Sequence, residues 1–168
     1  MTDLLMDEIE TPVGVVYVVT DGAQLCALDY HGYESRMHRL LGRRYPSYTL
    51  HATRDPHGIS TRIHAYMAGD FAAVQSLSVS TGGTPFQRRV WAALRDIPVG
   101  VTRTYGDIAA AIRAPTASRA VGAANGQNPV AIVVPCHRVI GANAALTGYA
   151  GGMERKQWLL AHEGVAIL

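Results

Sequence analysis

Cysteine is scarce in this sequence: among 168 residues there are two, Cys26 and Cys136. Two cysteines cannot build a disulfide framework, and neither has the CxxC or Cys/His spacing of a structural zinc site. Cys26 lies between apolar neighbours, where it is best interpreted as a small buried hydrophobe. We therefore expect no bound metal, and a protein that works in a reducing compartment.

Long hydrophobic runs are missing as well, and no segment approaches the length of a membrane span. The first eight residues are acidic and lack the basic start and the small-residue cleavage site of a secretory signal. Charged residues make up 17% and apolar residues 48% of the sequence, which is typical of an ordinary folded protein. These absences predict a cytoplasmic protein without a membrane partner.

The formal net charge of +2 hides an asymmetry between two halves. Residues 1–82 carry six arginines and nine acidic residues, whereas residues 83–168 carry nine basic and four acidic residues. The sign changes at Ser80-Thr81-Gly82-Gly83-Thr84-Pro85, where glycine and proline are typical of a domain boundary. We predict two domains, 1–82 and 83–168, and the basic balance of the second favours a polyanion as its partner.

The sequence pattern of residues 1–82 predicts an α/β scaffold, which consists of a small antiparallel sheet with helices. β-branched residues alternate over 9–19 around the turn Thr11-Pro12-Val13-Gly14. Asp21-Gly22 is a hairpin signal before a further strand at 25–30. No cluster of residues suited to chemistry occurs here, so we interpret this half as a scaffold.

Apolar spacing in the same half indicates helices over 35–44 and 59–68, and residues 71–79 are expected to be extended. The histidines are scattered without a close pair of the kind that binds metal. We expect all five to be exposed to solvent: His31, His38, His51, His57 and His64.

Residues 83–168 predict a mostly α-helical domain with a helix-turn-helix of winged-helix type. Thr84-Pro85 is typical of the start of a helix, with threonine as the N-cap and proline in the first turn. Thr104 and Asp107 form a capping-box pattern at the start of the next helix. Both helices carry an apolar stripe that indicates one buried side.

A third helix is expected over 117–124, capped by Thr116 or Ser118, and would complete the helix-turn-helix. Most of its side chains are small, in the run Arg119-Ala120-Val121-Gly122-Ala123-Ala124-Asn125-Gly126. Small side chains allow close helix packing, but a smooth face with one arginine also suits a DNA minor groove, and the composition favours neither. A last helix over 153–162 is expected to bury Trp158, Leu159 and Leu160.

The most distinctive segment is residues 132–141, in which apolar residues run through a proline into Cys136, His137 and Arg138. A thiol with the ordinary pKa of about 8.5 is mostly protonated at neutral pH, so a nucleophilic cysteine needs a base or a cation. Neighbouring side chains of an extended segment point to opposite faces, so His137 would help only through a bend or a bridging water. A carboxylate such as Glu163 would orient the imidazole. An inert buried cysteine beside a surface histidine stays open at this point.

The run Pro135-Cys136-His137-Arg138-Val139-Ile140-Gly141 resembles the active-site signature of the O6-alkylguanine-DNA alkyltransferases. The resemblance continues, in order and spacing, through Arg119-Ala120-Val121-Gly122, Asn128-Pro129, Gly148-Tyr149-Ala150-Gly151-Gly152, Trp158-Leu159-Leu160 and His162-Glu163-Gly164. The N-terminal half is more loosely similar, including its Thr11-Pro12-Val13-Gly14 turn. The size and plan are similar to the constitutive, single-function bacterial type of this family.

The resemblance implies direct-reversal DNA repair without a cofactor. The thiolate of Cys136 would take an alkyl group from O6 of guanine, and also from O4 of thymine, in one irreversible step. His137 would act as a water-mediated base oriented by Glu163. Tyr105 would donate a proton to the base ring, and Asn128 would support the active-site turn.

The implied partner is double-stranded DNA that contains O6-alkylguanine, bound by a monomer through the minor groove with the damaged nucleotide flipped out. Arg119 would fill the space that this nucleotide leaves in the stack. The other residues expected to contact DNA or the flipped base are Ala120, Gly122, Val139, Tyr149, Ala150 and Gly151.

Three other functions fit the sequence less well. Alkyltransferase-like proteins bind alkyl lesions as signals without transferring the group, and they carry tryptophan where this chain has Cys136. A winged-helix transcription factor needs a recognition helix rich in Arg, Asn or Gln, whereas residues 117–124 offer only Arg119. A thiol hydrolase would turn over repeatedly and need a distant histidine.

Overall fold

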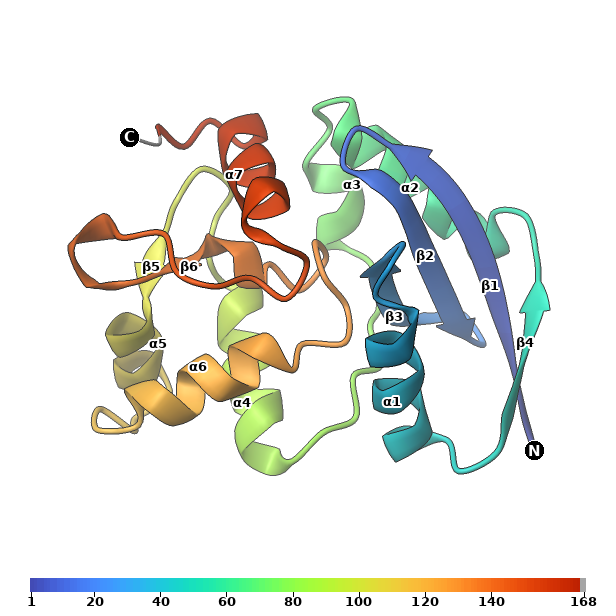
Figure 1. Ribbon diagram of the computed structural model, residues 1–168, viewed down its shortest axis with the longest axis horizontal. Helices are drawn as coiled ribbons and strands as arrows, with labels where there is room; N and C mark the ends of the chain where they lie inside the picture. The colour runs from blue at the N-terminus through green and yellow to red at the C-terminus, as the bar shows by residue number, and fades with distance from the viewer. Residues whose placement is uncertain (167–168) are drawn as a thin grey trace. The chain divides into compact units, whose positions relative to one another are not determined.

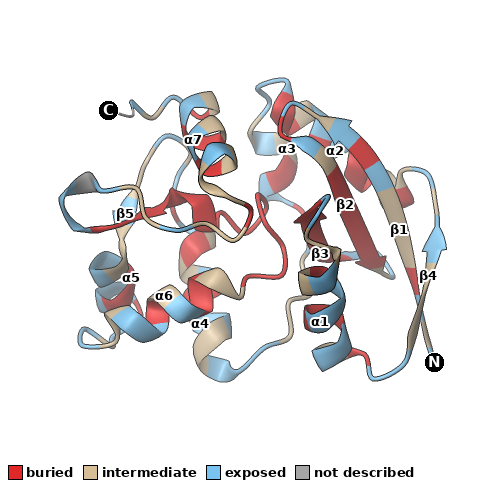
Figure 2. Cartoon of the chain, in the orientation of Figure 1, coloured by how far each residue is buried: buried red, intermediate tan, exposed pale blue. Residues whose placement is uncertain are grey.

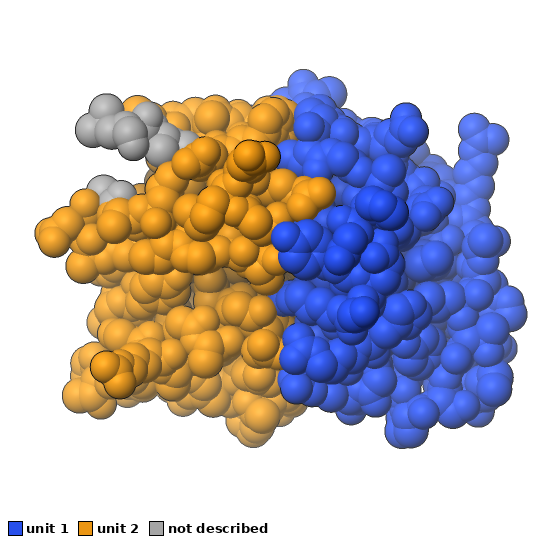
Figure 3. Space-filling model, in the orientation of Figure 1, with its two compact units in different colours: residues 1–82 blue, residues 83–168 orange. Residues whose placement is uncertain are grey.

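Four strands form the sheet of the N-terminal half in the order β3-β2-β1-β4 (Figure 1). Their bounds are β1 Thr2–Thr11, β2 Gly14–Asp21, β3 Gln24–Tyr30 and β4 Tyr48–Ala52. The computed structural model describes residues 1–166 of the chain. These residues divide into two compact units between Gly82 and Gly83, within the glycine- and proline-rich segment 80–85 (Figure 3).

The sheet is antiparallel over three strands and parallel at the fourth. β1, β2 and β3 follow one another through tight turns, as the hairpin signals predicted. The expected small antiparallel sheet is therefore confirmed for β1, β2 and β3, and β4, which the prediction did not include, adds a parallel pairing with β1. Helix α1 (Glu34–Arg44) lies between β3 and β4 in the chain and supplies the crossover that a parallel pairing requires. Sequence pattern missed β4 because none of its residues is fully buried, so it lacks a marked apolar alternation.

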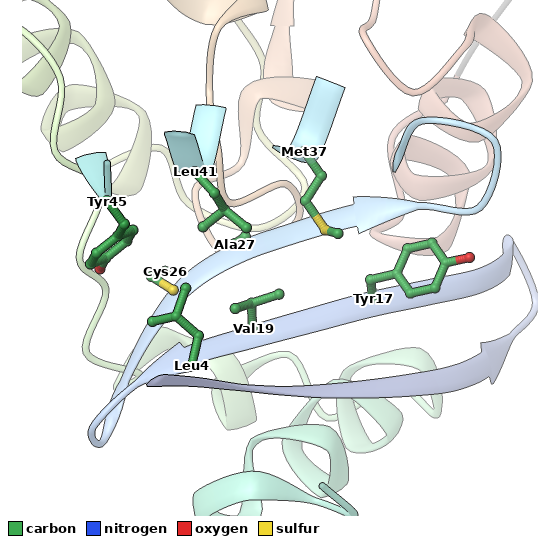
Figure 4. Close-up of a cluster of buried hydrophobic side chains, with 8 residues drawn as sticks. All are labelled: Leu4, Tyr17, Val19, Cys26, Ala27, Met37, Leu41 and Tyr45. Atoms are coloured by element: carbon green, nitrogen blue, oxygen red, sulfur yellow. The ribbon is translucent and has the colours of Figure 1, made fainter. Parts of the chain in front are cut away.

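Helix α1 buries the apolar residues that its spacing indicated, Met37, Leu40 and Leu41. Two of them join a core cluster with residues of the sheet (Figure 4): Leu4, Tyr17, Val19, Cys26, Ala27, Met37, Leu41 and Tyr45. Cys26 is fully buried in this cluster, and burial raises the pKa of its thiol to about 11. The interpretation of Cys26 as a small buried hydrophobe is confirmed.

The rest of the unit contains a 3₁₀ turn (Pro56–Gly58), α2 (Ile59–Met67) and α3 (Ala72–Gln75). The expected extended segment 71–79 was wrong, because it holds α3 and pairs with the sheet only at Val79. Val74 is buried within this one-turn helix, and Leu77 is buried just after its end. All five histidines of this half are exposed, as expected.

The second unit is mostly helical (Figure 1). Its elements are α4 Pro85–Arg95, β5 Arg103–Thr104, α5 Tyr105–Ala111, α6 Ser118–Gly126, the 3₁₀ turn η2 Cys136–Arg138, β6 Val139–Ile140, the 3₁₀ turn η3 Ala142–Ala144 and α7 Met153–His162. β5 and β6 form a short parallel pair. α4, α5 and α6 pack on one another, and Trp91 donates its indole N–H to the carbonyl of Ala124 at 2.9 Å.

Helix starts in this unit follow the predicted capping chemistry at two places of three. Thr84 and Thr104 both form complete capping boxes, with Gln87 and Asp107 as the reciprocal partners. α6 is different, because its N-cap is Ala117 and no side chain caps it. The expected caps at Thr116 or Ser118 were therefore wrong.

Helix α7 has the predicted bounds but buries a different set of side chains. Leu159 and Leu160 are buried, whereas Trp158 is half-buried and stacks on His162 with ring centroids 4.6 Å apart. Lys156 takes the third buried position of this helix. The expectation that Trp158 lies in the core was wrong.

The chain between α6 and Cys136 is buried without forming a strand (Figure 2). At Ile132 the backbone turns sharply: φ is +72° and Val133 N–H bonds to the carbonyl of Ala131 at 2.8 Å. A β-branched residue rarely adopts positive φ, so this turn stores strain that its surroundings must hold. A second tight turn follows, in which Cys136 N–H bonds to the carbonyl of Val134 at 2.8 Å. These turns place Cys136 in a 3₁₀ helix and not in the extended segment that the apolar run indicated.

Candidate active site

Cys136 begins the turn η2 and is only 4% exposed. It forms no disulfide. Its carbonyl accepts a hydrogen bond from the side-chain amide of Asn125 at 3.4 Å. The thiol therefore lies at the start of a helical turn, on a backbone that α6 holds from one side.

His137, Arg138 and Glu163 form one buried hydrogen-bonded group. Nε2 of His137 lies 2.8 Å from Oε2 of Glu163. Arg138 donates to both oxygens of the same carboxylate, from Nε at 2.7 Å and from Nη2 at 3.0 Å. Its Nη1 donates to the carbonyl of Ile97 at 2.7 Å. The structure thus brings Glu163 to His137 as predicted. Arg138 ties this carboxylate to the carbonyl of Ile97.

Burial sets the protonation state of His137. Its ring is completely buried, and this desolvation lowers the pKa of the imidazole below its ordinary value, while the bond to Glu163 opposes the shift. A neutral imidazole that donates Nε2–H to the carboxylate carries its lone pair on Nδ1. Nδ1 has no hydrogen-bond partner among the described residues. The lone pair on Nδ1 of His137 can therefore accept one proton.

Two asparagines near the end of α6 brace the strained segment that leads to Cys136. Asn128 donates to the carbonyl of Val134 at 2.7 Å and accepts from the N–H of Val130 at 3.0 Å. The expected supporting position of Asn128 agrees with these contacts. Asn125 was missed by sequence reasoning, although its place three residues before Asn128 puts both at the same end of α6.

Lys156 is the second functional candidate that the sequence did not reveal. It is the only lysine of the chain and is fully buried, with Nζ donating to the carbonyls of Val139 at 2.6 Å and Thr147 at 3.2 Å. Burial lowers the pKa of this amine to about 8, whereas the charge of Cys136 acts in the opposite direction. A lysine in a helix is ordinarily a surface residue, so its position in the sequence carried no signal beyond its being alone.

Tyr105 is half-buried at the first position of α5, and its hydroxyl lies 2.7 Å from Oγ1 of Thr147. Gly122 of α6 faces the ring of Tyr105, since a Cβ there would lie 3.8 Å from the ring carbons. Tyr105 therefore touches both α6 and the glycine-rich segment 142–152.

The remaining predicted residues differ in their exposure. Arg119 and Ala120 are exposed on α6. Because the other side chains of this helix are short, Arg119 is its one long, charged side chain. Val139 is buried directly after η2, Tyr149 and Ala150 are half-buried, and Gly151 is buried. Within residues 1–166, no three His, Cys, Asp or Glu side chains are grouped so that they could hold a metal ion. The same residues include no helix that is both long and apolar enough to cross a membrane.

A buried thiol followed by a histidine that a carboxylate orients is an arrangement typical of proteins with a cysteine nucleophile. The family model described as the DNA-binding domain of 6-O-methylguanine DNA methyltransferase matches residues 85–165. A methylated-DNA–protein-cysteine methyltransferase of Salmonella typhimurium is 50% identical over 171 residues, which cover 100% of both chains. A relative of the same name from Mycobacterium bovis is 45% identical over 155 residues, 90% of this chain and 87% of the relative.

Solved structures agree with these sequence matches. A Mycobacterium tuberculosis structure solved in complex with DNA has a TM-score of 0.79 and 43% identity, covering 95% of this chain and 92% of its own. An O6-methylguanine-DNA methyltransferase from Pyrococcus kodakaraensis has a TM-score of 0.74 and 28% identity, covering 96% and 99%. The chain belongs to the methylated-DNA–protein-cysteine methyltransferases, enzymes of DNA repair, as the resemblance of the Cys136 segment predicted.

Proposed function

We propose that this chain transfers an alkyl group from O6 of guanine in DNA to the thiolate of Cys136, once per molecule. The observation that carries this proposal is the state of His137, the residue that follows Cys136. Its imidazole is buried and neutral, Glu163 holds its Nε2, and its Nδ1 is without a hydrogen-bond partner among the described residues. A carboxylate-oriented imidazole is the arrangement that activates a weak nucleophile.

The proposed reaction is a single displacement. The thiol proton passes through a water molecule to Nδ1 of His137, and the sulfur then attacks the alkyl carbon. The S–C bond forms as the C–O6 bond breaks, and the electron pair moves onto the guanine. Tyr105 donates a proton to the base ring, which balances the proton that His137 has taken. A thioether is a poor leaving group, so the protein acts once.

DNA recognition is the second part of the proposal. An alkyl group on O6 lies inside the paired duplex, so the nucleotide must be flipped out before the buried thiol can reach it. We propose that α5 and α6 act as a helix-turn-helix whose smooth α6 enters the minor groove. Arg119 fills the vacated space, and Ala120 and Gly122 approach the backbone.

The flipped base would lie against Val139 and the glycine-rich segment that contains Tyr149, Ala150 and Gly151. The same surface would admit O4-alkylthymine, which presents an alkyl group on an exocyclic oxygen as O6-alkylguanine does. We propose that the protein acts as a monomer, because the whole catalytic group lies within one chain.

The test is an intact-mass measurement after incubation with a duplex that contains O6-methylguanine. We expect one added methyl group per protein, mapped to Cys136 by peptide digestion, and none in a Cys136→Ser variant. A Cys26→Ser variant is the matched control and should react normally. Lesion binding without any added mass would support the signalling function instead, and repeated turnover would support the hydrolase.

A further inference from the structure

Thr147 lies between Tyr105 and the buried Lys156, which in turn bonds to the segment after Cys136. Its hydroxyl oxygen lies 2.7 Å from the hydroxyl of Tyr105, where either group can donate the hydrogen bond. Its carbonyl accepts from Nζ of Lys156 at 3.2 Å, and the same Nζ bonds to Val139, directly after the turn that begins with Cys136. One residue therefore links Tyr105 to the buried lysine.

The methyl group of the Thr147 side chain is also in a fixed position. A Cβ on Gly141 would lie 2.8 Å from the methyl carbon of Thr147, so that methyl group packs into the space which the glycine leaves. With its methyl against Gly141 and its carbonyl on Lys156, Thr147 can direct its hydroxyl only toward Tyr105. A β-branched side chain has few rotamers in any case, which makes this orientation stiff.

We propose that Thr147 is a positioning residue that holds the hydroxyl of Tyr105 and supports its proton donation. The inference rests on the proposed function. When Tyr105 gives its proton to the base, its oxygen gains negative charge and must accept a hydrogen bond. The hydroxyl of Thr147 is in contact at 2.7 Å, and rotation of its hydrogen lets it donate to that oxygen without movement of the chain.

The experiment is a double-mutant cycle on the rate of alkyl transfer, measured in single turnover with excess protein. Thr147→Val keeps the shape of the side chain and removes the hydroxyl, and Thr147→Ser keeps the hydroxyl. We expect valine to lower the maximal transfer rate about 3- to 10-fold with unchanged DNA affinity, the effect of one hydrogen bond. Serine should restore the rate to within about 2-fold. Thr49→Val, on β4 of the other unit, is the matched control and should have no effect.

The decisive comparison is made in a Tyr105→Phe background, where valine at position 147 should cause no further loss. An equal loss with and without the Tyr105 hydroxyl would overturn the proposal, because Thr147 would then act only through the fold. If Tyr105→Phe alone leaves the rate unchanged, the proton donor is wrong and the inference fails with it, while transfer to Cys136 stands. If Thr147→Val does not fold, Thr147→Ala is put through the same cycle with the same criteria.

Discussion

Glu163 and Arg138 form a two-point ion pair in the interior, with Nε at 2.7 Å from Oε1 and Nη2 at 3.0 Å from Oε2. The same carboxylate holds Nε2 of His137 at 2.8 Å. One buried acid thus neutralises the cation of Arg138 and selects the tautomer of His137. A change at Glu163 should therefore affect both the stability of the fold and the proposed reaction.

Glu163→Gln should therefore lower both stability and transfer rate. The amide leaves Arg138 buried without a counter-charge, which should reduce the free energy of unfolding by about 3 kcal/mol. The amide also has one acceptor oxygen where the carboxylate has two, so it cannot hold His137 and both Arg138 donors together, and the transfer rate should fall at least about 10-fold. Urea unfolding and single-turnover rates measure the two effects. Glu154→Gln, exposed at the start of α7, the helix that Glu163 follows, should change neither.

Stability should depend on pH through His137. Burial lowers its pKa below the ordinary 6.5, so in acid the unfolded chain binds a proton that the folded protein does not. The free energy of unfolding should be fully retained above about pH 6.5 and fall as the pH drops toward the lowered pKa. Urea unfolding at several pH values measures this slope. His137→Asn should flatten it, whereas the exposed His64→Asn should not; equal slopes in both variants would contradict the assignment.

Lys156 should produce a dependence at alkaline pH. Its folded pKa of about 8 lies below the ordinary 10.5, so between these values the unfolded chain binds a proton that the folded protein has lost. The free energy contributed by Lys156 should therefore rise as the pH increases from 8 toward 10.5. Lys156→Met should abolish this contribution, measured as the difference in unfolding free energy between wild type and variant at each pH. A constant difference would show that the amine does not titrate in this range, and Gln157→Met, exposed on α7, is the control.

Arg119→Ala should separate base flipping from chemistry. Arg119 is exposed, so its loss should change the free energy of unfolding by less than about 0.5 kcal/mol. Transfer from O6-methylguanine in a duplex should slow about 10-fold or more, because nothing fills the vacated stack. Transfer from the free base O6-benzylguanine needs no flipping and should proceed at the wild-type rate. Equal slowing with both substrates would place Arg119 in the chemistry instead.

Much of this fold could be predicted because the responsible interactions are local. Thr104 caps α5 through Asp107, three residues away, and the bounds of α7 follow from an apolar stripe and its flanking glycines. β4 and α3 could not be predicted in this way. The first is stabilised by pairing with β1, some 45 residues distant, and the second is a single turn with one buried residue, Val74, too short to give an apolar stripe.

For the site, the sequence by itself determined the candidate groups: the thiol of Cys136, the imidazole of His137 and the carboxylate of Glu163, predicted from the resemblance of their segments to the family. The tertiary structure alone decided how they meet. It bent the apolar run at Ile132 into turns, buried the single lysine under the Cys136 segment and brought Thr147 to Tyr105. The physical reason is separation along the chain: Tyr105 and Thr147 lie 42 residues apart, and only packing can make them neighbours.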